Sequence, residues 1–434
     1  MTVRRPVAGR RPSLRAAVLA SAMVAGLGTA GCSSSSSGGP PSLAEIATVL
    51  AQHGKAVLAH DRTAFLAGLG TGAKAAEFRG RQEDAFDNLR RLPLAAWSYG
   101  GVSRTDDREV ETAATKRYGT RAVVVRTSLS YALRGVDRTP TSHDLWWTFI
   151  RQHGRVVAVA DNGLAEAGGV SWQGPWDFGP LDVERTAHSL VLGHTDTVAA
   201  GTLRAIGAAV ESAVPAVSAV WGTAWARTVA VVVPSTPAEL AAQVGQTSAI
   251  TTAVAAVAIS DGDATLGDAP AGQRLIVNSA AFSRLSSVGR QIVVRHEITH
   301  IADAQATTEA SPRWLVEGFA DYVGNLGSGQ SPRTAAAELG RDVRAGKLPT
   351  TLPKDAAFET NGAAAQAYEG AWLACRLIAA RSGQPALVRF YKLVGASPGN
   401  ADAAVAAALE GVLHETTAAF TAQWRAYVRS ELRR

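Results

Sequence analysis

The sequence has few cysteines, little net charge outside its N-terminus, and no long hydrophobic run beyond the first thirty residues. Two cysteines in 434 residues exclude a disulfide framework. The net charge of +6 is mainly N-terminal, because five of the 43 basic residues lie in the first fifteen positions and the rest nearly balance 37 acidic residues. This balance argues against a nucleic-acid partner. With 47% hydrophobic and 18% charged residues, the composition is typical of a globular chain of two or three domains.

The first 32 residues have the pattern of an export signal. An arginine-rich start precedes the apolar run 16–30, which is too short to span a bilayer as a stable helix. The run ends in Thr29-Ala30-Gly31-Cys32, followed by five serines, and this resembles the bacterial lipobox. The resemblance implies that Cys32 is lipidated and becomes the N-terminus, anchoring an extracytoplasmic protein to the cell membrane. A simple secretory signal cleaved near Ala30 is the alternative.

Residues 33–42 form a Ser/Gly/Pro segment that predicts a flexible linker. Residues 43–165 then predict a small α+β domain, since helical periodicity up to about residue 92 gives way to β-rich segments at 121–133, 144–151 and 155–160. This order of elements resembles the cone-shaped folds related to nuclear transport factor 2. Trp146 and Trp147 occupy adjacent strand positions, so we expect one in the core and the other at the surface.

Residues 166–185 are rich in Gly and Pro and predict an inter-domain linker. In the remainder, 186–434, apolar runs predict four strands, at 189–192, 228–233, 254–259 and 274–278, with helices at 198–214 and 237–244. From residue 287 to the end the pattern is helical. The expected fold class is therefore α+β: a small domain, then a mixed sheet with a helical C-terminal half. Cys375 lies in an apolar helical pattern and is expected in the core.

One short motif carries the chemistry of the second domain. The sequence His296-Glu297-Ile298-Thr299-His300 places two imidazoles one helical turn apart on the same face, where both can reach a single Zn²⁺. Glu297 lies about 100° further round the helix, beside the metal, where its carboxylate can take a proton from water. A pair of satisfied core histidines is the structural alternative.

A second segment completes the set of zinc ligands. Catalytic zinc requires three protein ligands and an open position for water. In Trp314-Leu315-Val316-Glu317-Gly318-Phe319-Ala320, Glu317 lies 17 positions after His300, which leaves room for a loop and a second helix. Asp321 follows one turn later and is positioned to accept the spare N–H of a ligand histidine, a role for which Asp303 is the rival.

Together these two segments resemble the gluzincin metallopeptidases, and within them the catalytic domain of the thermolysin and aminopeptidase N type. The resemblance implies Zn²⁺ bound by His296, His300 and Glu317, with Glu297 as general base and acid and a peptide or protein as substrate. It also implies that strand 274–278 is the sheet edge to which an extended substrate adds.

The sequence departs from aminopeptidases at that strand. It reads Leu275-Ile276-Val277-Asn278 and lacks their Gly-x-Met-x-Asn motif, so an endopeptidase is favoured over an aminopeptidase. The family also uses a downstream Tyr or His to stabilise the oxyanion. Tyr368 is the main candidate, ahead of His414 and Tyr322.

Two other functions fit the same residues. The first is a zinc-binding scaffold or binding lipoprotein that keeps a peptidase fold without turnover. The second is a zinc hydrolase that acts on an amide other than a peptide. The completeness of the set, with three ligands, a base and an outer carboxylate, favours the peptidase.

Overall fold

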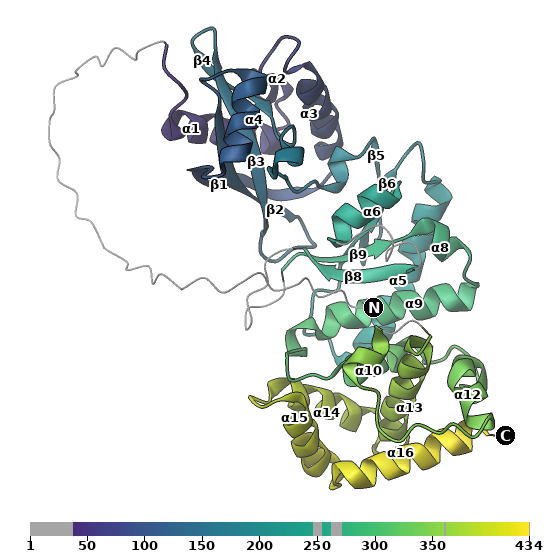
Figure 1. Cartoon of the computed structure of the whole chain (residues 1–434). Coiled ribbons are helices and arrows are strands. Elements are labelled where there is room, and N and C mark those ends of the chain that lie inside the picture. Colours follow the sequence, from purple (N-terminus) through teal and green to yellow (C-terminus); the bar gives the residue numbers. More distant parts are fainter. Residues whose placement is uncertain (1–37, 246–253, 262–270, 360–361, 434) are drawn as a thin grey trace, which may run out of the picture.

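The structure is a computed structural model that describes residues 38–245, 254–261, 271–359 and 362–433. The predicted signal peptide, with Cys32, and the linker up to residue 37 lie outside the described residues. A small α+β unit lies at one end of the molecule, a second sheet lies in the middle, and a helical half lies at the other end (Figure 1). Two separate sheets combined with helices agree with the α+β class expected from the sequence.

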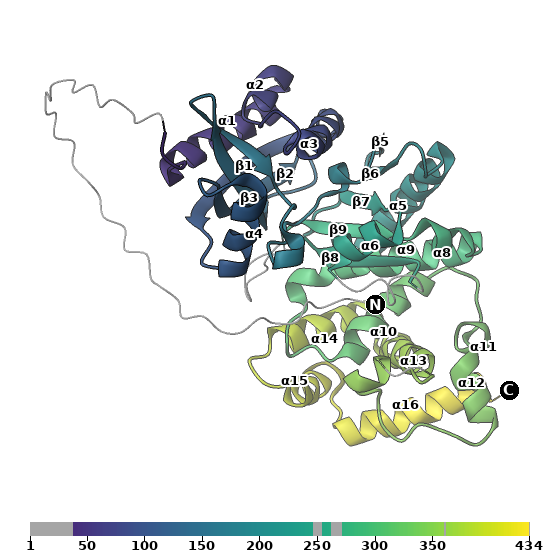
Figure 2. The same ribbon diagram turned by 45° about the horizontal axis from the view of Figure 1, so that its top comes forward.

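The first unit is a four-stranded antiparallel sheet in the order β1-β2-β3-β4. Three helices pack on one face of this sheet, and α4 packs on the other (Figures 1 and 2). The elements are α1 (Leu43–Ala59), α2 (Arg62–Ala67), α3 (Ala76–Leu89), β1 (Leu94–Arg104), α4 (Arg108–Tyr118), β2 (Val123–Leu133), β3 (Thr141–Gln152) and β4 (Arg155–Ala160).

Local chemistry accounts for several of these elements. Helix α1 is capped by Ser42, whose hydroxyl accepts from the Glu45 N–H while the Glu45 carboxylate accepts from the Ser42 N–H. In β3, Trp147 is buried among the helices, whereas Trp146 is half-buried on the opposite face against α4. The expectation of one core and one outer tryptophan is confirmed.

The sequence analysis missed β1 and α4. Strand β1 contains the pair Gly100-Gly101, with Gly101 at a φ of 61°, and its register with β2 shifts there. Such an interruption removes the strict alternation that identifies a strand in a sequence. Helix α4 is short and polar, and it is held by an Asp107 cap and by only two buried residues, Val110 and Ala114.

The second sheet has the strand order β5-β6-β7-β9-β8, in which the three central strands are parallel and the two outer strands are antiparallel to their neighbours. Strand β5 lies within the segment expected to be a linker. The elements that form and connect this sheet are β5 (Leu181–Arg185), β6 (Ser189–His194), α5 (Ala200–Trp221), β7 (Val229–Val233), α6 (Pro237–Val244), β8 (Ala256–Ser260) and β9 (Gln273–Val277).

The position of the sheet edge corrects one expectation. The segment 274–278 was expected to be the edge strand, but β9 lies between β7 and β8, so the edge is β8. The physical reason is that β9 continues the parallel order of the central strands, and β8 then pairs back against it as the antiparallel neighbour. The sequence alone does not fix this order, because both strands are short apolar runs.

The second sheet is buried on both faces. Val191, Val231 and Leu275 point toward α5 and α9, and alternate residues of the same strands, such as Val232 and Ile276, point the other way. This second face shares a hydrophobic core with the first unit. The two units therefore pack against one another through apolar side chains rather than being joined only by a tether.

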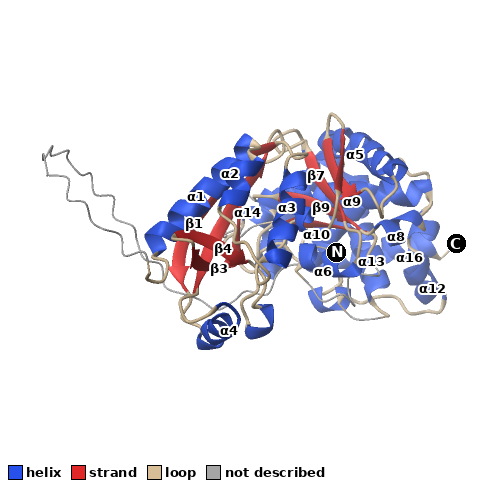
Figure 3. Cartoon of the chain, turned by 90° about the horizontal axis from the view of Figure 1, so that it is seen from above, coloured by secondary structure: helices blue, strands red, loops and turns tan. Residues whose placement is uncertain are grey.

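Helix α5 is the one described helix long and apolar enough to cross a membrane by length and composition. In the structure it lies against the sheet and α9, seen from above in Figure 3, with residues such as Leu203, Val210 and Val217 in the core. The buried residues of α5 thus lie on the side that faces the sheet and α9.

The rest of the chain is helical, as the sequence pattern predicts. The helix α13 runs through the middle of this half and buries Cys375 completely, as expected. The elements are α8 (Ser279–Ser283), α9 (Ser287–Asp303), η3 (Ala304–Ala306), α10 (Arg313–Asn325), α11 (Pro332–Ala335), α12 (Ala337–Arg344), η4 (Asp355–Phe358), α13 (Ala364–Ser382), α14 (Gln384–Ala396), α15 (Ala401–Ala408), η5 (Leu409–Leu413) and α16 (Thr417–Leu432).

Candidate metal centre

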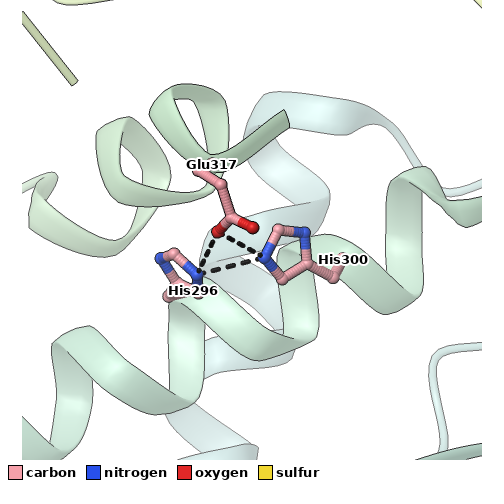
Figure 4. A group of neighbouring side chains, drawn as sticks. All are labelled: His296, His300 and Glu317. Atoms are coloured by element: carbon pink, nitrogen blue, oxygen red, sulfur yellow. Dashed lines mark hydrogen bonds and ion pairs between the residues drawn. The ribbon is translucent and has the colours of Figure 1, made fainter. Parts of the chain in front are cut away.

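Two neighbouring helices present the candidate ligands. The hydroxyl of Ser286 caps helix α9, which is buried from His296 to its end beneath the second sheet. Helix α10 lies beside α9 and carries Glu317 in a fully buried stretch. His296 and His300 face Glu317 across the gap between the two helices (Figure 4).

The three candidate ligand atoms converge closely. The Nε2 atoms of His296 and His300 lie 3.0 Å apart, and Glu317 Oε2 lies 3.4 Å from the first and 3.5 Å from the second. All three residues are buried. A tetrahedral zinc ion with bonds of about 2.0–2.1 Å places its ligand atoms about 3.3 Å apart. The site thus fits Zn²⁺ in the identity, number and mutual spacing of its ligand atoms.

Glycines allow this close assembly of helices. A Cβ on Gly318 would lie 2.3 Å from the carbonyl oxygen of Ala371 in α13, and one on Gly324 would lie 2.9 Å from that of Ile292 in α9. Both positions therefore require the absence of a side chain, and both fix how deeply α10 sits between its neighbours. The sequence analysis did not assign these roles, although Gly318 follows Glu317 directly.

Asp321 lies behind the first histidine. Its Oδ1 is 2.8 Å from His296 Nδ1, the ring nitrogen that faces away from the other ligands. Burial by itself lowers the pKa of His296, but the charge and hydrogen bond of Asp321, the hydrogen bond to Glu317 and the charge of Glu297 raise it to about 10. The hydrogen bond to Asp321 makes Nδ1 the donor, and this orientation of the ring directs Nε2 at the metal position.

Asp303 does not take this role in the structure. It is buried, and its carboxylate accepts from the Thr307 hydroxyl at 3.3 Å, while His300 Nδ1 has no hydrogen-bond partner among the described residues. Burial raises the pKa of Asp303 to about 6, although the His300 charge opposes this shift. Asp303 therefore lies near the second histidine, but its described hydrogen bond is to Thr307.

Glu297 projects from α9 toward the edge strand. Its Oε2 accepts a 2.8 Å hydrogen bond from the backbone N–H of Ala258 in β8, and its side chain is buried. The negative charge of Glu297 also raises the pKa of His296. The carboxylate is thus fixed beside the ligand cluster and beside the edge strand β8. The sequence analysis had no means of finding the contribution of Ala258, because it lies in a backbone N–H.

Tyr368 lies in the first turns of α13 with its ring 5.0 Å from that of Phe358. Its hydroxyl oxygen is shielded from solvent and has no hydrogen-bond partner among the described residues. Burial raises the pKa of Tyr368, and the negative charge of Glu317 raises it further. The hydroxyl therefore keeps its proton and lies within electrostatic range of the ligand cluster.

The other oxyanion candidates have different surroundings. His414 is exposed at the end of η5 in the left-handed conformation, with a φ of 56°. Burial raises the pKa of Tyr322, and the charges that act on it are those of Cys375 and Arg376 in α13. Arg313 also belongs to the surroundings of the metal centre, although the sequence did not indicate it. Its Nε lies 3.7 Å from Glu317 Oε1.

Comparison with known proteins finds only a distant structural similarity. No protein-family model matches the chain, and no curated protein matches it. Among solved structures, it is similar to a mutant M1 zinc metallopeptidase from Deinococcus radiodurans bound to a Tyr-Ser-Ala substrate, with 15% identity over 78% of this chain and 70% of that chain and a TM-score of 0.34.

A two-domain M1 zinc metallopeptidase bound to L-arginine matches with 14% identity and the same TM-score of 0.34. This match covers 71% of the present chain, which spans only 61% of the length of that protein. At this level of similarity, a function for the present chain has to be argued from the side chains of its own site.

Proposed function

We propose that the protein is a zinc-dependent peptidase that hydrolyses internal peptide bonds. The observation that carries the proposal is the convergence of His296, His300 and Glu317 with ligand atoms 3.0–3.5 Å apart, beside the carboxylate of Glu297. A zinc ion bound there would supply a Lewis acid and lower the pKa of a bound water to about 7.

Glu297 acts as the general base and then as the general acid. It accepts a proton from the attacking water and returns it to the leaving amine nitrogen. The hydrogen bond from Ala258 holds the carboxylate in one orientation, so that its position does not depend on substrate. Tyr368 keeps its proton and donates its hydroxyl hydrogen to the oxyanion as charge develops on the carbonyl oxygen.

The substrate adds to β8 as an extended strand. Residues 255 and 261 pair with β9 through their backbone groups, so the alternate positions Ala256, Ala258 and Ser260 direct theirs to the outer side, where the N–H of Ala258 is bonded to Glu297 and the groups of Ala256 and Ser260 face the substrate. An extended peptide on that side passes Glu297. Neither β8, which reads Ala-Val-Ala-Ile-Ser, nor β9 carries the Gly-x-Met-x-Asn motif of aminopeptidases, which supports cleavage within a chain.

The test is cleavage of heat-denatured casein at pH 7 by the zinc-loaded protein and by Glu297→Gln. The glutamine retains an oxygen that accepts from Ala258 but cannot take a proton, so we expect unchanged zinc content and a loss of about 10²–10⁴ in kcat. Glu309→Gln, at an exposed position in the loop before α10, is the matched control and should keep full activity. Full turnover by Glu297→Gln would contradict the proposed role. No chelator-sensitive cleavage in the unmodified protein would favour the zinc-binding scaffold instead.

We also propose that the protein acts at a bacterial cell envelope, anchored through lipidated Cys32. The support is the apolar run that ends in Thr29-Ala30-Gly31-Cys32. Expressed in a bacterial host, the full chain should enter the membrane fraction with an acylated N-terminal Cys32 by mass spectrometry. Cys32→Ser should abolish acylation, whereas Ser33→Ala should not. An unmodified N-terminus near residue 31 would indicate a simple secretory signal.

A further inference from the structure

The two carboxylate oxygens of Glu317 have different surroundings. Oε2 converges with the two histidines, 3.4 and 3.5 Å from their Nε2 atoms, and Figure 4 draws both contacts from this one oxygen. Oε1 lies 3.7 Å from Nε of Arg313, one turn earlier in α10. The side chain of Glu317 is 1% exposed and that of Arg313 is 17% exposed, so water screens their attraction only weakly. A positive charge therefore lies beside the second oxygen of a candidate ligand.

The guanidinium of Arg313 is itself held in place by the segment 355–359. Asp355 Oδ1 accepts from the backbone N–H of Arg313 at 2.9 Å, and Glu359 Oε1 accepts from its Nη1 at 3.2 Å. The guanidinium carbon lies 5.3 Å from the centroid of the Phe358 ring. A planar guanidinium that contacts an aromatic face and a carboxylate has few other orientations. These contacts fix Arg313 by groups of the protein alone, without substrate.

The stability of α10 does not account for an arginine at this position. Arg313 is the first residue of the helix, where the positive end of the helix dipole disfavours a cation. The first turn of α10 contains no acidic residue. A cation four positions before a glutamate is also the less favourable order for a helical ion pair. The contact with Glu317 is therefore the better explanation for the charge.

The same guanidinium acts on the proposed oxyanion residue, Tyr368. Burial and the charge of Glu317 raise the pKa of Tyr368, and the positive charge of Arg313 opposes both effects. The ring of Phe358, which contacts the guanidinium, also packs edge-on against that of Tyr368, with the centroids 5.0 Å apart. Arg313 thus lies near both the candidate ligand and the hydroxyl.

We propose that Arg313 is a positioning residue of the metal centre: it pairs with Oε1 of Glu317 and so directs Oε2 at the two histidines. A carboxylate has two equivalent oxygens, and a fixed cation beside one of them leaves the other for the metal. Groups that orient a metal ligand in this way typically change metal affinity by about 10–100-fold. The inference rests on the proposed function, because it requires Glu317 to bind the metal.

The test is the zinc affinity of the metal-free protein, measured by competition with a fluorescent chelator. Arg313→Met keeps an unbranched apolar stem but removes the charge, so we expect zinc to bind about 10–100-fold more weakly. Arg313→Lys keeps a positive charge without the planar guanidinium, and its loss should be smaller. Arg341→Met is the matched control, because it removes the arginine of an exposed ion pair with Glu338 in α12 and should leave zinc affinity unchanged.

A second measurement separates positioning from folding. The visible absorption of Co²⁺ bound in place of zinc depends on the number and arrangement of the ligand atoms. Its spectrum should change in Arg313→Met and return toward that of the unmodified protein in Arg313→Lys. If circular dichroism shows that Arg313→Met is unfolded, Arg313→Gln, which is also uncharged, replaces it in both measurements.

Three results would overturn this inference alone. They are unchanged zinc affinity in the folded uncharged variant, an unchanged Co²⁺ spectrum in that variant, and an equal loss of affinity in that variant and in Arg313→Lys. Absence of zinc binding in the unmodified protein would overturn the proposed function as well.

Discussion

The backbone N–H of Ala258 donates a 2.8 Å hydrogen bond to Oε2 of Glu297. This bond joins the edge strand β8 to the helix that carries both candidate histidine ligands. The same strand leads into Asp261, whose Oδ2 accepts from the Tyr131 hydroxyl of the first unit at 2.5 Å. The position of the proposed base is therefore connected, through the edge strand, to the interface between the two units.

This bond predicts different stabilities for two variants of Glu297. Glu297→Ala leaves the buried Ala258 N–H without its acceptor and should lower the free energy of unfolding by about 1–3 kcal/mol. Glu297→Gln retains an oxygen that accepts from Ala258, so its free energy of unfolding should fall by a smaller amount. Urea unfolding of both variants in the absence of metal measures the difference. Equal stabilities would show that the bond contributes nothing.

Asp321 predicts an effect on metal affinity rather than on chemistry. Asp321→Asn removes the negative charge that holds His296 Nδ1 as a donor, so zinc affinity should fall by about 10–100-fold. Competition with a fluorescent chelator measures this change. Asp402→Asn, at an exposed position in α15, should bind zinc as the unmodified protein does. Unchanged affinity in Asp321→Asn would remove Asp321 from the site.

A buried ion pair between the two units predicts a large loss of stability. Arg274 of β9 contacts Asp137 at 2.6 Å, and both side chains are at most 4% exposed. Asp137→Asn leaves the arginine charge buried with only part of its pairing, so we expect a loss of about 3–5 kcal/mol. The exposed pair of Arg126 and Asp144 is the control, and Asp144→Asn should cost less than about 1 kcal/mol. Similar losses from both variants in urea unfolding would contradict this account of the interface.

His53 predicts sensitivity to acid. Its pKa is lowered by burial to about 3 in the folded state, so below about pH 6.5 the unfolded chain binds a proton that the folded chain does not. Stability should therefore fall as the pH decreases from 6.5 toward 3, by up to about 1.4 kcal/mol per pH unit from this residue. His53→Phe should flatten the profile from urea unfolding, and His60→Asn, at an exposed position, should not. Parallel profiles for His53→Phe and the unmodified protein would contradict the assignment.

The residues at the centre of the site were predictable because helical geometry is local. His296 and His300 are one turn apart in any α-helix. The candidate ligand Glu317 follows in a second apolar helix, after enough residues for a loop that lets this helix run antiparallel to the first. The contribution of Asp321 follows from the same one-turn spacing. These predictions depend on period and residue type, both of which are visible in a sequence.

The features that were missed or wrong depend on tertiary order. Whether β8 or β9 forms the edge depends on which strand pairs with β7, and both have similar apolar sequences. The contact of Ala258 with Glu297 uses a backbone group and so leaves no trace in residue type. The shared core between the units arises from side chains far apart in the sequence.

The central claim is that His296, His300 and Glu317 bind one zinc ion. Elemental mass spectrometry on the purified chain from residue 33 onward, beside His296→Ala, tests it most directly. We expect one zinc per molecule in the unmodified protein and none in the variant, with both folded by circular dichroism. No zinc in either protein after reconstitution with Zn²⁺, or equal zinc in both, would contradict the account.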